Sequence, residues 1–402
     1  MKKLNILIVH NYYQIPGGED TVVANEKKML EEYGHKVVLY TRSNTELSTF
    51  SKLQKLSLPF TTIFNPRTYR DIKNIIKEHK IDIVHVHNTL NLVSPSAYYA
   101  ALKTGVPVVQ TIHNFRLLCP KATFYRDGHI CEDCVSKGLS CAIKHNCYRD
   151  SRIQTLACVI NILFHRHTGI YKKIYYICLT DFNKDKLLLL NRPGKKKRIL
   201  SSHIWVKPNF ANDVLERVPY DKRKNQFIYA GRLDPSKGLS ILLNAWKLLG
   251  RDAPELIICG NGPLEDWCKQ YISENHLSQV KMKGSVSNQT VRQLIGNSKA
   301  LILPTQWYEG FPMTIVEAFS MYTPVIGSNM GNVGNLIHNG KNGYTFQYDS
   351  SQDLANAVVK MINCSMSFSQ DEFEKYSYKE NYKLLTDIYN QIINFSPASN
   401  ED

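Results

Sequence analysis

The sequence predicts an α/β protein with two doubly wound, Rossmann-like domains that face each other across a cleft. Three observations indicate this fold. Short apolar segments alternate with segments of helical periodicity along most of the chain. The alternation pauses at 206–214 (VKPNFANDV), which reads as a linker, and then restarts. The halves also differ in charge: residues 1–200 carry 31 Lys and Arg against 15 Asp and Glu, and residues 201–402 carry 19 against 20.

The first series opens with a strand at 4–9 that lacks polar alternation, as a buried parallel strand does. The loop after it holds a glycine pair, Gly17-Gly18, whose backbone a phosphate can approach closely. This loop lacks the GxGxxG pattern, so a nicotinamide cofactor is not supported. Residues 43–65 are polar and irregular. The other elements expected here are helices at 21–33, 69–79, 94–104 and around 187–190, and strands at 36–41, 81–87, 106–112 and 175–181.

The second series follows the same pattern. Pro312 suits the start of a helix that continues until Pro324 stops it. Residues 330–346 carry several glycine and asparagine turn signals and end in a short strand. The other expected elements are strands at 226–231, 255–260, 280–284, 300–303 and 324–328, and helices at 236–249, 264–274, 288–297, 351–362 and 373–395. We therefore predict an N-terminal domain at 1–205, completed by the C-terminal helix at about 373–395, and a C-terminal domain at 206–372.

Composition indicates a soluble protein. The 402 residues are enough for two cores, and a hydrophobic fraction of 43% is ordinary. The longest apolar run, about 156–164, is much shorter than the 18 or so residues that a membrane span needs. The start, MKKLNILIVHNYYQ, reads as a strand and not as a signal peptide. We expect a cytoplasmic protein whose ten cysteines are mostly reduced.

Positive charge is densest at 152–198. An anionic lipid surface or a lipid-phosphate substrate would explain it. Nucleic acid is the competing explanation, and a solvated basic face is the plainest one.

The stretch 300–326 carries the strongest chemical signal. Glu309 lies on the loop that leaves a strand, and Glu317 lies about one turn inside the following helix. Both should therefore face the crevice at the carboxyl end of a parallel sheet, where such sheets bind ligands. The N–H groups of Gly310, Phe311 and Met313 should point into the same crevice and suit an anion. Alone, the two glutamates could be an ordinary loop residue and a solvated helix residue.

Two other strand ends supply what this crevice lacks. The turn 231–238 (GRLDPSKG) places Arg232 and Lys237 on either side of a helix start, where both can reach one anion such as a diphosphate. Gly260 and Gly262 form a tight turn after the next strand. The three strand ends together predict a site for a nucleotide diphosphate that carries a polyol.

These motifs resemble those of the retaining glycosyltransferases of family 4, also called glycosyl transferases group 1, which have the two-Rossmann GT-B fold. The segment EGFPMTIVE is similar to the E-x7-E motif of that family, GRLDPSKG to its phosphate-binding motif, and GNGP to its G-x-G-P turn. The resemblance covers essentially the whole chain. It implies a hexosyltransferase of the EC 2.4 class, with an acceptor-binding N-terminal domain and a C-terminal domain that binds the nucleotide sugar.

The resemblance also implies roles for single residues. Arg232 and Lys237 hold the diphosphate of the donor, Glu309 contacts the hydroxyls of the transferred sugar, and Glu317 contacts the ribose. Gly17 and Gly18 form a loop that closes on the phosphates, and His113 matches the histidine near the 6-position of the sugar. Pro312 departs from the pattern and removes one N–H that could contact phosphate. The remaining donor-binding residues expected from the motifs are Gly260, Gly262, Gly310 and Phe311.

The mechanism expected from these residues rests on charge. Negative charge grows on the departing diphosphate, and Arg232, Lys237 and a helix N-terminus stabilise it. Because no nucleophilic carboxylate stands out, we favour front-face attack, in which the leaving phosphate oxygen takes the proton of the acceptor. The chain contains no Asp-x-Asp, so no catalytic metal is expected.

A cysteine cluster lies apart from these motifs. Cys131 and Cys134 have metal-knuckle spacing, and the expected ligands of a structural zinc are Cys119, Cys131, Cys134 and Cys147, with His145 in reserve. Plain buried cysteines are the equal alternative.

The leading hypothesis is thus a retaining transferase that moves a hexose-type sugar from a UDP- or GDP-sugar to a saccharide or a polyprenyl-diphosphate-linked acceptor. The setting would be surface polysaccharide biosynthesis, that is, capsule, exopolysaccharide or lipopolysaccharide, at the inner face of the cell membrane. A sugar phosphorylase or sugar-phosphate synthase of the same fold is the near alternative. A non-catalytic, zinc-stabilised basic binding protein is the alternative from another class.

Overall fold

In the computed structural model, residues 2–15, 17–211, 216–363 and 371–395 are described. The chain divides into two compact units. The first comprises Met1–Ala122, Glu132–Pro208 and Asn381–Asp402, and the second comprises Thr123–Cys131 and Asn209–Glu380. The division near Pro208 lies three residues beyond the predicted boundary, within the predicted linker 206–214, whose last three residues lie outside the described parts. The segment 123–131 groups with the second unit, although the sequence pattern assigned it to the first.

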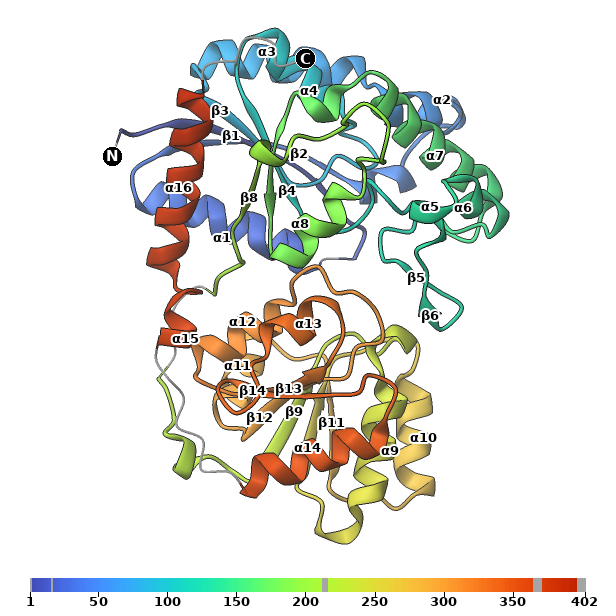
Figure 1. The fold of residues 1–402 in the computed structure, drawn as a ribbon, viewed down its shortest axis with the longest axis vertical. Coiled ribbons are helices and arrows are strands. Elements are labelled where there is room, and N and C mark those ends of the chain that lie inside the picture. The colour runs from blue at the N-terminus through green and yellow to red at the C-terminus, as the bar shows by residue number, and fades with distance from the viewer. Residues whose placement is uncertain (1, 16, 212–215, 364–370, 396–402) are drawn as a thin grey trace. The chain divides into compact units, whose positions relative to one another are not determined.

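The first unit is built on a parallel six-stranded sheet with the order β2-β1-β3-β4-β7-β8 (Figure 1). Its central strands are buried on both faces, as expected of apolar runs without alternation. The strands are β1 (Asn5–Tyr12), β2 (Lys36–Ser43), β3 (Ile83–Val86), β4 (Val108–Ile112), β7 (Tyr175–Cys178) and β8 (Ile204–Val206). Strand β8, at the edge, starts where the sequence showed only the approach to a linker.

The helices of this unit connect successive strands. They are α1 (Gly18–Glu32), α2 (Lys52–Ile63), α3 (Pro66–His79), α4 (Ser96–Lys103), α5 (Asp133–Ser136), α6 (Ser140–Lys144), α7 (Arg152–His167) and α8 (Asp181–Leu188). Short 3-10 turns η1 (Asn44–Ser48), η2 (Ile170–Lys172) and η3 (Ser201–His203) complete the unit. Helix α2 lies in the stretch that the sequence left irregular. Ser51 and Gln54 form a capping box that starts it, a signal that its polar composition masked.

The C-terminal helix α16 (Tyr378–Asn394) packs on the first unit from Asn381 onward. The ring of Tyr382 stacks on Tyr33, and the Tyr389 hydroxyl bonds His85. Trp205 on β8 donates to Gln391. These contacts join the end of the chain to its first half.

The second unit also has a parallel six-stranded sheet, with the order β11-β10-β9-β12-β13-β14. Its strands are β9 (Gln226–Ala230), β10 (Glu255–Cys259), β11 (Val280–Gly284), β12 (Ala300–Leu303), β13 (Val325–Ser328) and β14 (Gly343–Phe346). Its helices are α9 (Leu239–Leu249), α10 (Glu265–Glu274), α11 (Asn288–Gly296), α12 (Met313–Ser320), α13 (Gly331–Leu336), α14 (Ser351–Asn363) and α15 (Asp371–Glu374). Turns η4 (Tyr220–Lys222), η5 (Pro235–Lys237) and η6 (Gly250–Asp252) and the hairpin of β5 (Tyr125–Arg126) and β6 (His129–Ile130) also belong to this unit.

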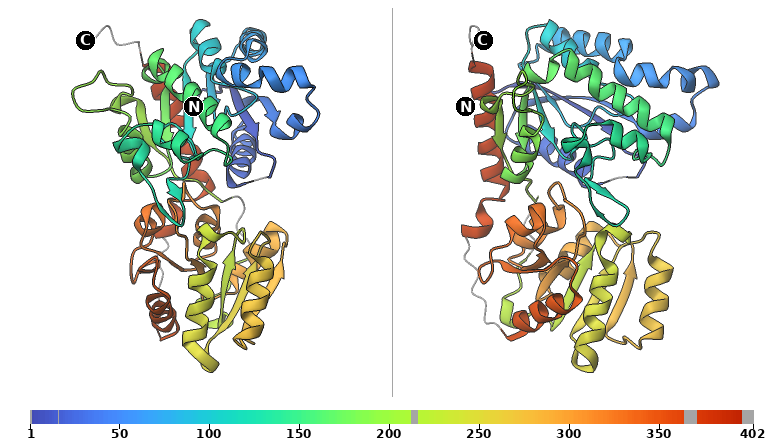
Figure 2. Two further views of the ribbon diagram at one scale, coloured as in Figure 1. Left: turned by 90° about the vertical axis from the view of Figure 1, so that its right-hand side faces the viewer. Right: turned by 45° about the vertical axis from the view of Figure 1, so that its right-hand side comes forward.

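The core of the second unit lies between its sheet and helices α9 and α14, around the fully buried Trp246. Figure 2 shows α9 and α10 side by side along this sheet. Pro312 is the N-cap of α12 and not its first helical residue. Helix α13 occupies part of a stretch that was predicted as loop.

The fold class predicted from the sequence is confirmed: two α/β units, each with a parallel sheet and helical crossovers. In the described parts of the chain, no helix combines the length and the apolar character that crossing a bilayer requires.

Candidate active site

The strand order of the second sheet determines where a ligand can bind. Counted within this sheet, the order is 3-2-1-4-5-6, the order of the dinucleotide-binding folds. The order reverses between β9 and β12, and ligands bind in open α/β sheets at the carboxyl ends of the two strands at this point. The loop 231–238 follows β9, and the loop 304–312 follows β12. The two strongest motifs of the sequence therefore meet at the switch point.

Glycines hold these loops close together. A side chain on Gly238, whose φ is 69°, would lie 1.8 Å from the carbonyl oxygen of Pro304. A side chain on Gly260, at φ 134°, would lie 1.9 Å from the carbonyl oxygen of Gly231. Both distances are far below van der Waals contact. The GNGP turn thus needs Gly260 in order to pack on the Arg232 loop, a reason separate from the predicted approach to a phosphate.

Lys237 and Glu309 form the centre of the site. The Lys237 ammonium lies 2.6 Å from Glu309 Oε1, and Glu309 is only 8% exposed. The same oxygen accepts from the Trp307 indole at 2.7 Å and from the Thr305 hydroxyl at 3.1 Å. The ammonium also lies over the Trp307 ring, 4.9 Å from its centroid. A buried carboxylate is thus held by three donors, one of which is a cation that reaches solvent.

Arg232 lies on the same loop in a more open position. Its side chain is 53% exposed and contacts Asp234 at 3.2 Å. Burial alone would raise the pKa of Asp234, but hydrogen bonds from Ser236 and the charges of Arg232 and Lys237 lower it overall. Arg232 is therefore a cation free to turn toward an anion without leaving a buried carboxylate unpaired.

Glu317 has other neighbours than Glu309. It is buried on α12, and the Asn288 amide donates to its Oε1 at 2.7 Å. Burial raises its pKa, while Asn288 and Arg292 act in the opposite direction. Phe311 is buried against Tyr376, at 6.1 Å between ring centroids, and Gly310 accepts from Asn332 through its carbonyl. The two glutamates thus lie in separate hydrogen-bond networks.

The first sheet has the order 2-1-3-4-5-6 counted within its unit, so its strand order reverses between β1 and β3. Histidines lie at this point: His10 on β1, and His85 and His87 on and just after β3. His87 Nδ1 lies 2.9 Å from Nε2 of the predicted site residue His113, which follows β4. Burial lowers the pKa of His85 to about 4 and those of His87 and His113 well below the usual value. His113 is therefore a neutral imidazole near neutral pH.

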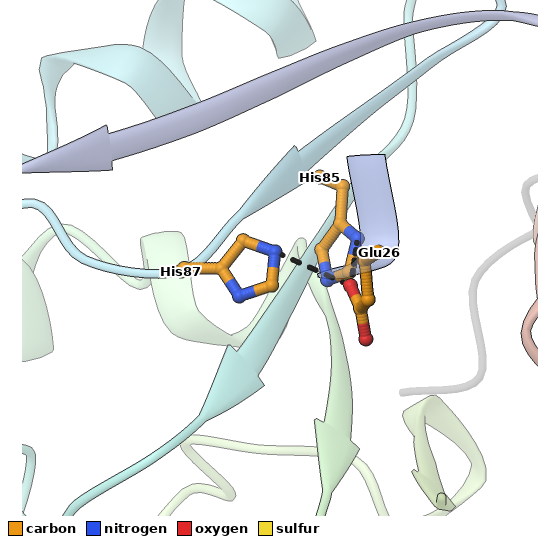
Figure 3. A group of neighbouring side chains, drawn as sticks. All are labelled: Glu26, His85 and His87. Carbon is orange, nitrogen blue, oxygen red and sulfur yellow. Dashed lines mark ion pairs between the residues drawn. The ribbon is translucent and has the colours of Figure 1, made fainter. Parts of the chain in front are cut away.

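A buried glutamate supports these rings. Glu26 Oε2 lies 3.6 Å from His85 Nδ1 and 3.4 Å from His87 Nε2 (Figure 3). Its Oε1 forms an ion pair with Lys207 at 2.8 Å, and the side chains of both are fully buried. Among the described residues, Glu26, His85 and His87 are the ligand-type group that could surround a metal ion. The Lys207 ammonium already neutralises this carboxylate, so a divalent cation would meet a positive charge there.

Gly17 and Gly18 lie at the start of α1 and are exposed. The Gly17 N–H donates to Asp20 at 2.9 Å, and Asp20 also contacts His10 at 2.7 Å. Glu19 follows Gly18 in the first turn of α1. Burial raises the pKa of its carboxyl group to about 8, so this group is largely protonated at neutral pH. The loop therefore presents a helix N-terminus without the full charge of two carboxylates.

The four cysteines predicted as zinc ligands are only partly brought together. Cys134 is buried in a small cluster with Cys141 and Cys147 beside it. Burial, with Cys119 and Cys147 nearby, raises the pKa of the Cys134 thiol to about 12. In the described parts of the chain, no three of these sulfurs lie as close together as the atoms of the histidine–glutamate group. The structural zinc stays a prediction, which metal analysis of the purified protein tests.

Four residues of the site were not predicted from the sequence. Thr305 and Trp307 bind Glu309, and Asn332 on α13 donates to the carbonyls of Glu309 and Gly310. Phe124, which precedes the β5–β6 hairpin, packs edge-on against Tyr308 at 6.3 Å. Thr305 and Trp307 lie in the stretch 300–326, which the sequence analysis assigned to the site, so their positions could have indicated a role. Nothing in the sequence around Asn332 or Phe124 indicated that they belong to the site.

Comparison with known families identifies the class. A model of glycosyl transferases group 1 matches residues 213–380, and a model of glycosyltransferase family 4 matches residues 16–129. Together they match most of the chain. The chain is therefore a glycosyltransferase of the group 1, family 4 type with a GT-B fold.

Individual relatives agree with this class. The chain is 23% identical to an uncharacterized glycosyltransferase of Methanocaldococcus jannaschii, over 90% of this chain and 89% of that protein. It is also 23% identical to the GPI3 subunit of phosphatidylinositol N-acetylglucosaminyltransferase from Saccharomyces cerevisiae, over 97% and 83%. Two solved structures share the fold. One is the apo form of the lipopolysaccharide outer core galactosyltransferase WaaB, with a TM-score of 0.63, 19% identity and 96% and 99% of the two chains covered. The other is Anabaena HepE with UDP and glucose, with a TM-score of 0.65, 16% identity and 96% and 100% covered.

Proposed function

We propose that this glycosyltransferase transfers a hexose-type sugar, with retention, from a UDP- or GDP-sugar to a saccharide or lipid-linked acceptor. The observation that carries the proposal is the Lys237–Glu309 pair at the switch point of the second sheet. It couples a cation that reaches solvent to a carboxylate that can accept hydrogen bonds from sugar hydroxyls.

Donor binding follows from an exchange of partners. A diphosphate carries more negative charge than one carboxylate, so it competes for the Lys237 ammonium and attracts the exposed Arg232 guanidinium. Glu309 then accepts from the hydroxyls of the sugar instead, while Trp307 and Thr305 keep it in place. The HepE structure, determined with UDP and glucose, supports this choice of ligand.

The remaining roles follow the family pattern. Glu317, held by Asn288, would accept from the ribose hydroxyls. Gly17 and Gly18 would form the loop that closes on the phosphates, and neutral His113 would lie near the sugar. Because these roles need no metal, we propose that the reaction requires no cofactor.

Catalysis would proceed by stabilising the leaving group. As the glycosyl–phosphate bond breaks, negative charge grows on the diphosphate. Lys237 and Arg232 stabilise this charge most strongly because they contact the diphosphate. The acceptor hydroxyl attacks from the same face, and its proton passes to the departing phosphate oxygen. Neutral His113 can accept or donate a hydrogen bond without adding charge.

The acceptor and the setting are proposed from relatives and from charge. One protein with a similar structure is a lipopolysaccharide outer core galactosyltransferase, and one relative belongs to a phosphatidylinositol N-acetylglucosaminyltransferase. A polyprenyl-diphosphate-linked saccharide and the biosynthesis of a surface polysaccharide fit these two proteins and the basic first half. We accordingly propose a cytoplasmic enzyme, peripheral at the inner face of the cell membrane.

A sugar-phosphate synthase is the second candidate, because a sucrose-phosphate synthase shares the fold with a TM-score of 0.66 at 14% identity. It would use the same donor site but a phosphorylated sugar as acceptor.

The test has two stages. Thermal unfolding with a panel of nucleotide diphosphates and their sugars identifies the donor, because a ligand at about 100 times its Kd adds about 2.7 kcal/mol of stability. NMR of the product then reports the anomeric configuration, and we expect retention. An inverted product refutes the mechanism. Transfer only to sugar phosphates favours the second candidate, and no stabilisation by any nucleotide refutes the proposal.

A further inference from the structure

Two helices of the first unit expose an unusual amount of apolar surface. Eight of the sixteen exposed large apolar side chains in the described parts lie on α2 and α7. Figures 1 and 2 show these helices near one another at the edge of the unit. The eight residues, which we call the α2–α7 face, are Leu53, Leu56 and Phe60 on α2 and Ile153, Leu156, Ile160, Leu163 and Phe164 on α7.

Helix α7 is apolar on both sides. Its exposed residues repeat at intervals of three, four, three and one, which places them on one face. Its opposite face is buried and includes Cys158, Val159 and Ile162, which pack in a small core with Leu139. A helix that is apolar all round is normally buried all round. Here one face remains in solvent, with Ile153 at 79% exposure.

Helix α2 has no buried residue. Leu53 and Phe60 are 79% and 75% exposed and lie on one face with Leu56. Its C-terminal end is tied to α7, because the Asn161 amide donates to the Thr62 carbonyl at 2.7 Å and His165 Nε2 bonds the Ile63 carbonyl at 3.0 Å. A twelve-residue helix gains little stability by itself in water. Burial of its apolar face in another apolar medium, such as a lipid layer, would therefore stabilise it.

Charge decides what can cover this face. No Asp or Glu occurs in residues 47–70 or 151–180. Lys52, Lys55 and Arg152 are exposed on the two helices. A second copy of the chain on this face would bring these cations against one another. An anionic lipid surface would attract them while taking up the leucines, isoleucines and phenylalanines, as it does with interfacial amphipathic helices.

We propose that the α2–α7 face is the site at which this enzyme docks on an anionic bilayer. The inference rests on the proposed function in one respect, namely that the acceptor is lipid-linked. The buried face of α7 supports the connection, because Cys158, Asn161 and Ile162 line the same pocket as His113 and Arg116. Docking through α7 would therefore hold this pocket close to the lipid surface where the acceptor is anchored.

The test is co-sedimentation with vesicles of phosphatidylcholine alone and with about 30% phosphatidylglycerol. The wild-type chain should bind the anionic vesicles. The variant Leu53→Ser/Leu56→Ser/Phe60→Ser should bind about tenfold less, since three apolar side chains no longer enter the lipid. The matched control, Leu248→Ser/Val359→Ser/Ile362→Ser, removes three exposed apolar side chains from the second unit and should bind like wild type. A second variant, Lys52→Glu/Lys55→Glu, keeps the apolar side chains and should lose binding to the anionic vesicles.

Two further measurements separate the outcomes. Slow hydrolysis of the donor sugar, measured without vesicles, should be unchanged in all variants because none touches the proposed active site. If the wild type hydrolyses donor but does not bind anionic vesicles, or if the α2 variants bind as well as the control, the docking surface is overturned and the proposed function stands. If vesicles bind but no donor is hydrolysed, the proposed function fails instead. Light scattering that shows a dimer for wild type and a monomer for the α2 variant would assign the face to a second copy and overturn the proposal.

Discussion

The two sheets place opposite chemistry at equivalent points. In each unit, the carboxyl ends of the strands on either side of the reversal carry ionisable side chains. In the second unit they are Lys237 and Glu309, a charged pair whose cation reaches solvent. In the first unit they include His85 and His87, which are neutral. Both histidines lie next to Glu26, which forms a fully buried ion pair with Lys207.

The difference indicates what the carboxyl edge of each sheet, where its strands end, can do. A partly exposed cation can leave its carboxylate for a ligand, because the ligand neutralises the cation while Trp307 and Thr305 continue to donate to Glu309. A fully buried pair cannot separate without leaving a charge in a medium of low polarity. The second edge is therefore suited to binding a charged donor, whereas the first is suited to holding neutral hydrogen-bonding groups in fixed positions.

The largest expected effect comes from removing the exchangeable cation. Lys237→Ala should lower the rate of donor hydrolysis or transfer about 10³-fold, because one preorganised charge no longer stabilises the leaving group. Steady-state kinetics measures it. The control is Lys269→Ala, which breaks an exposed pair with Glu265 and should leave the rate unchanged. Equal activity of both variants would contradict the assignment of the second edge as the donor site.

The next effect concerns stability. Lys207→Met should destabilise the fold by about 3–5 kcal/mol, because it leaves Glu26 buried and unpaired. The double variant Glu26→Gln/Lys207→Met should regain much of this loss, since no uncompensated charge remains. Urea unfolding measures all three proteins. If the double variant is as unstable as Lys207→Met, the loss does not come from an unpaired Glu26 charge. The described difference between the carboxyl edges of the two sheets would then be contradicted.

The smallest effect is a pH dependence. The folded-state pKa of His85 is about 4, below the ordinary value of 6.5, so the unfolded chain binds more protons between these values. Stability is therefore fully present above pH 6.5 and falls as the pH drops toward 4. His85 alone should cost about 2 kcal/mol between pH 7 and pH 5, and His165, also with a pKa of about 4, adds to the loss. Thermal unfolding as a function of pH measures it; a flat profile over this range would contradict neutral buried histidines.

The sequence by itself determined the fold class, most of the strands, and the residues at the switch point of the second sheet. Each of these is local: an apolar run specifies a buried parallel strand, and a residue just after it must lie at the carboxyl edge. The Arg232–Lys237 turn and Glu309 could be read in this way because each motif lies within a few residues of its strand.

Only the tertiary structure decided which of these residues meet. Lys237 and Glu309 are 72 residues apart, and their contact depends on β9 and β12 being neighbours in the sheet. Lys207 looked like part of a linker, yet it forms a fully buried ion pair with Glu26 on α1, which is far from it in the sequence. Likewise, the apolar face of α2 was hidden because a short helix without buried residues leaves no periodic core signal. Strand order and long-range pairing are properties of the folded chain, which local periodicity does not encode.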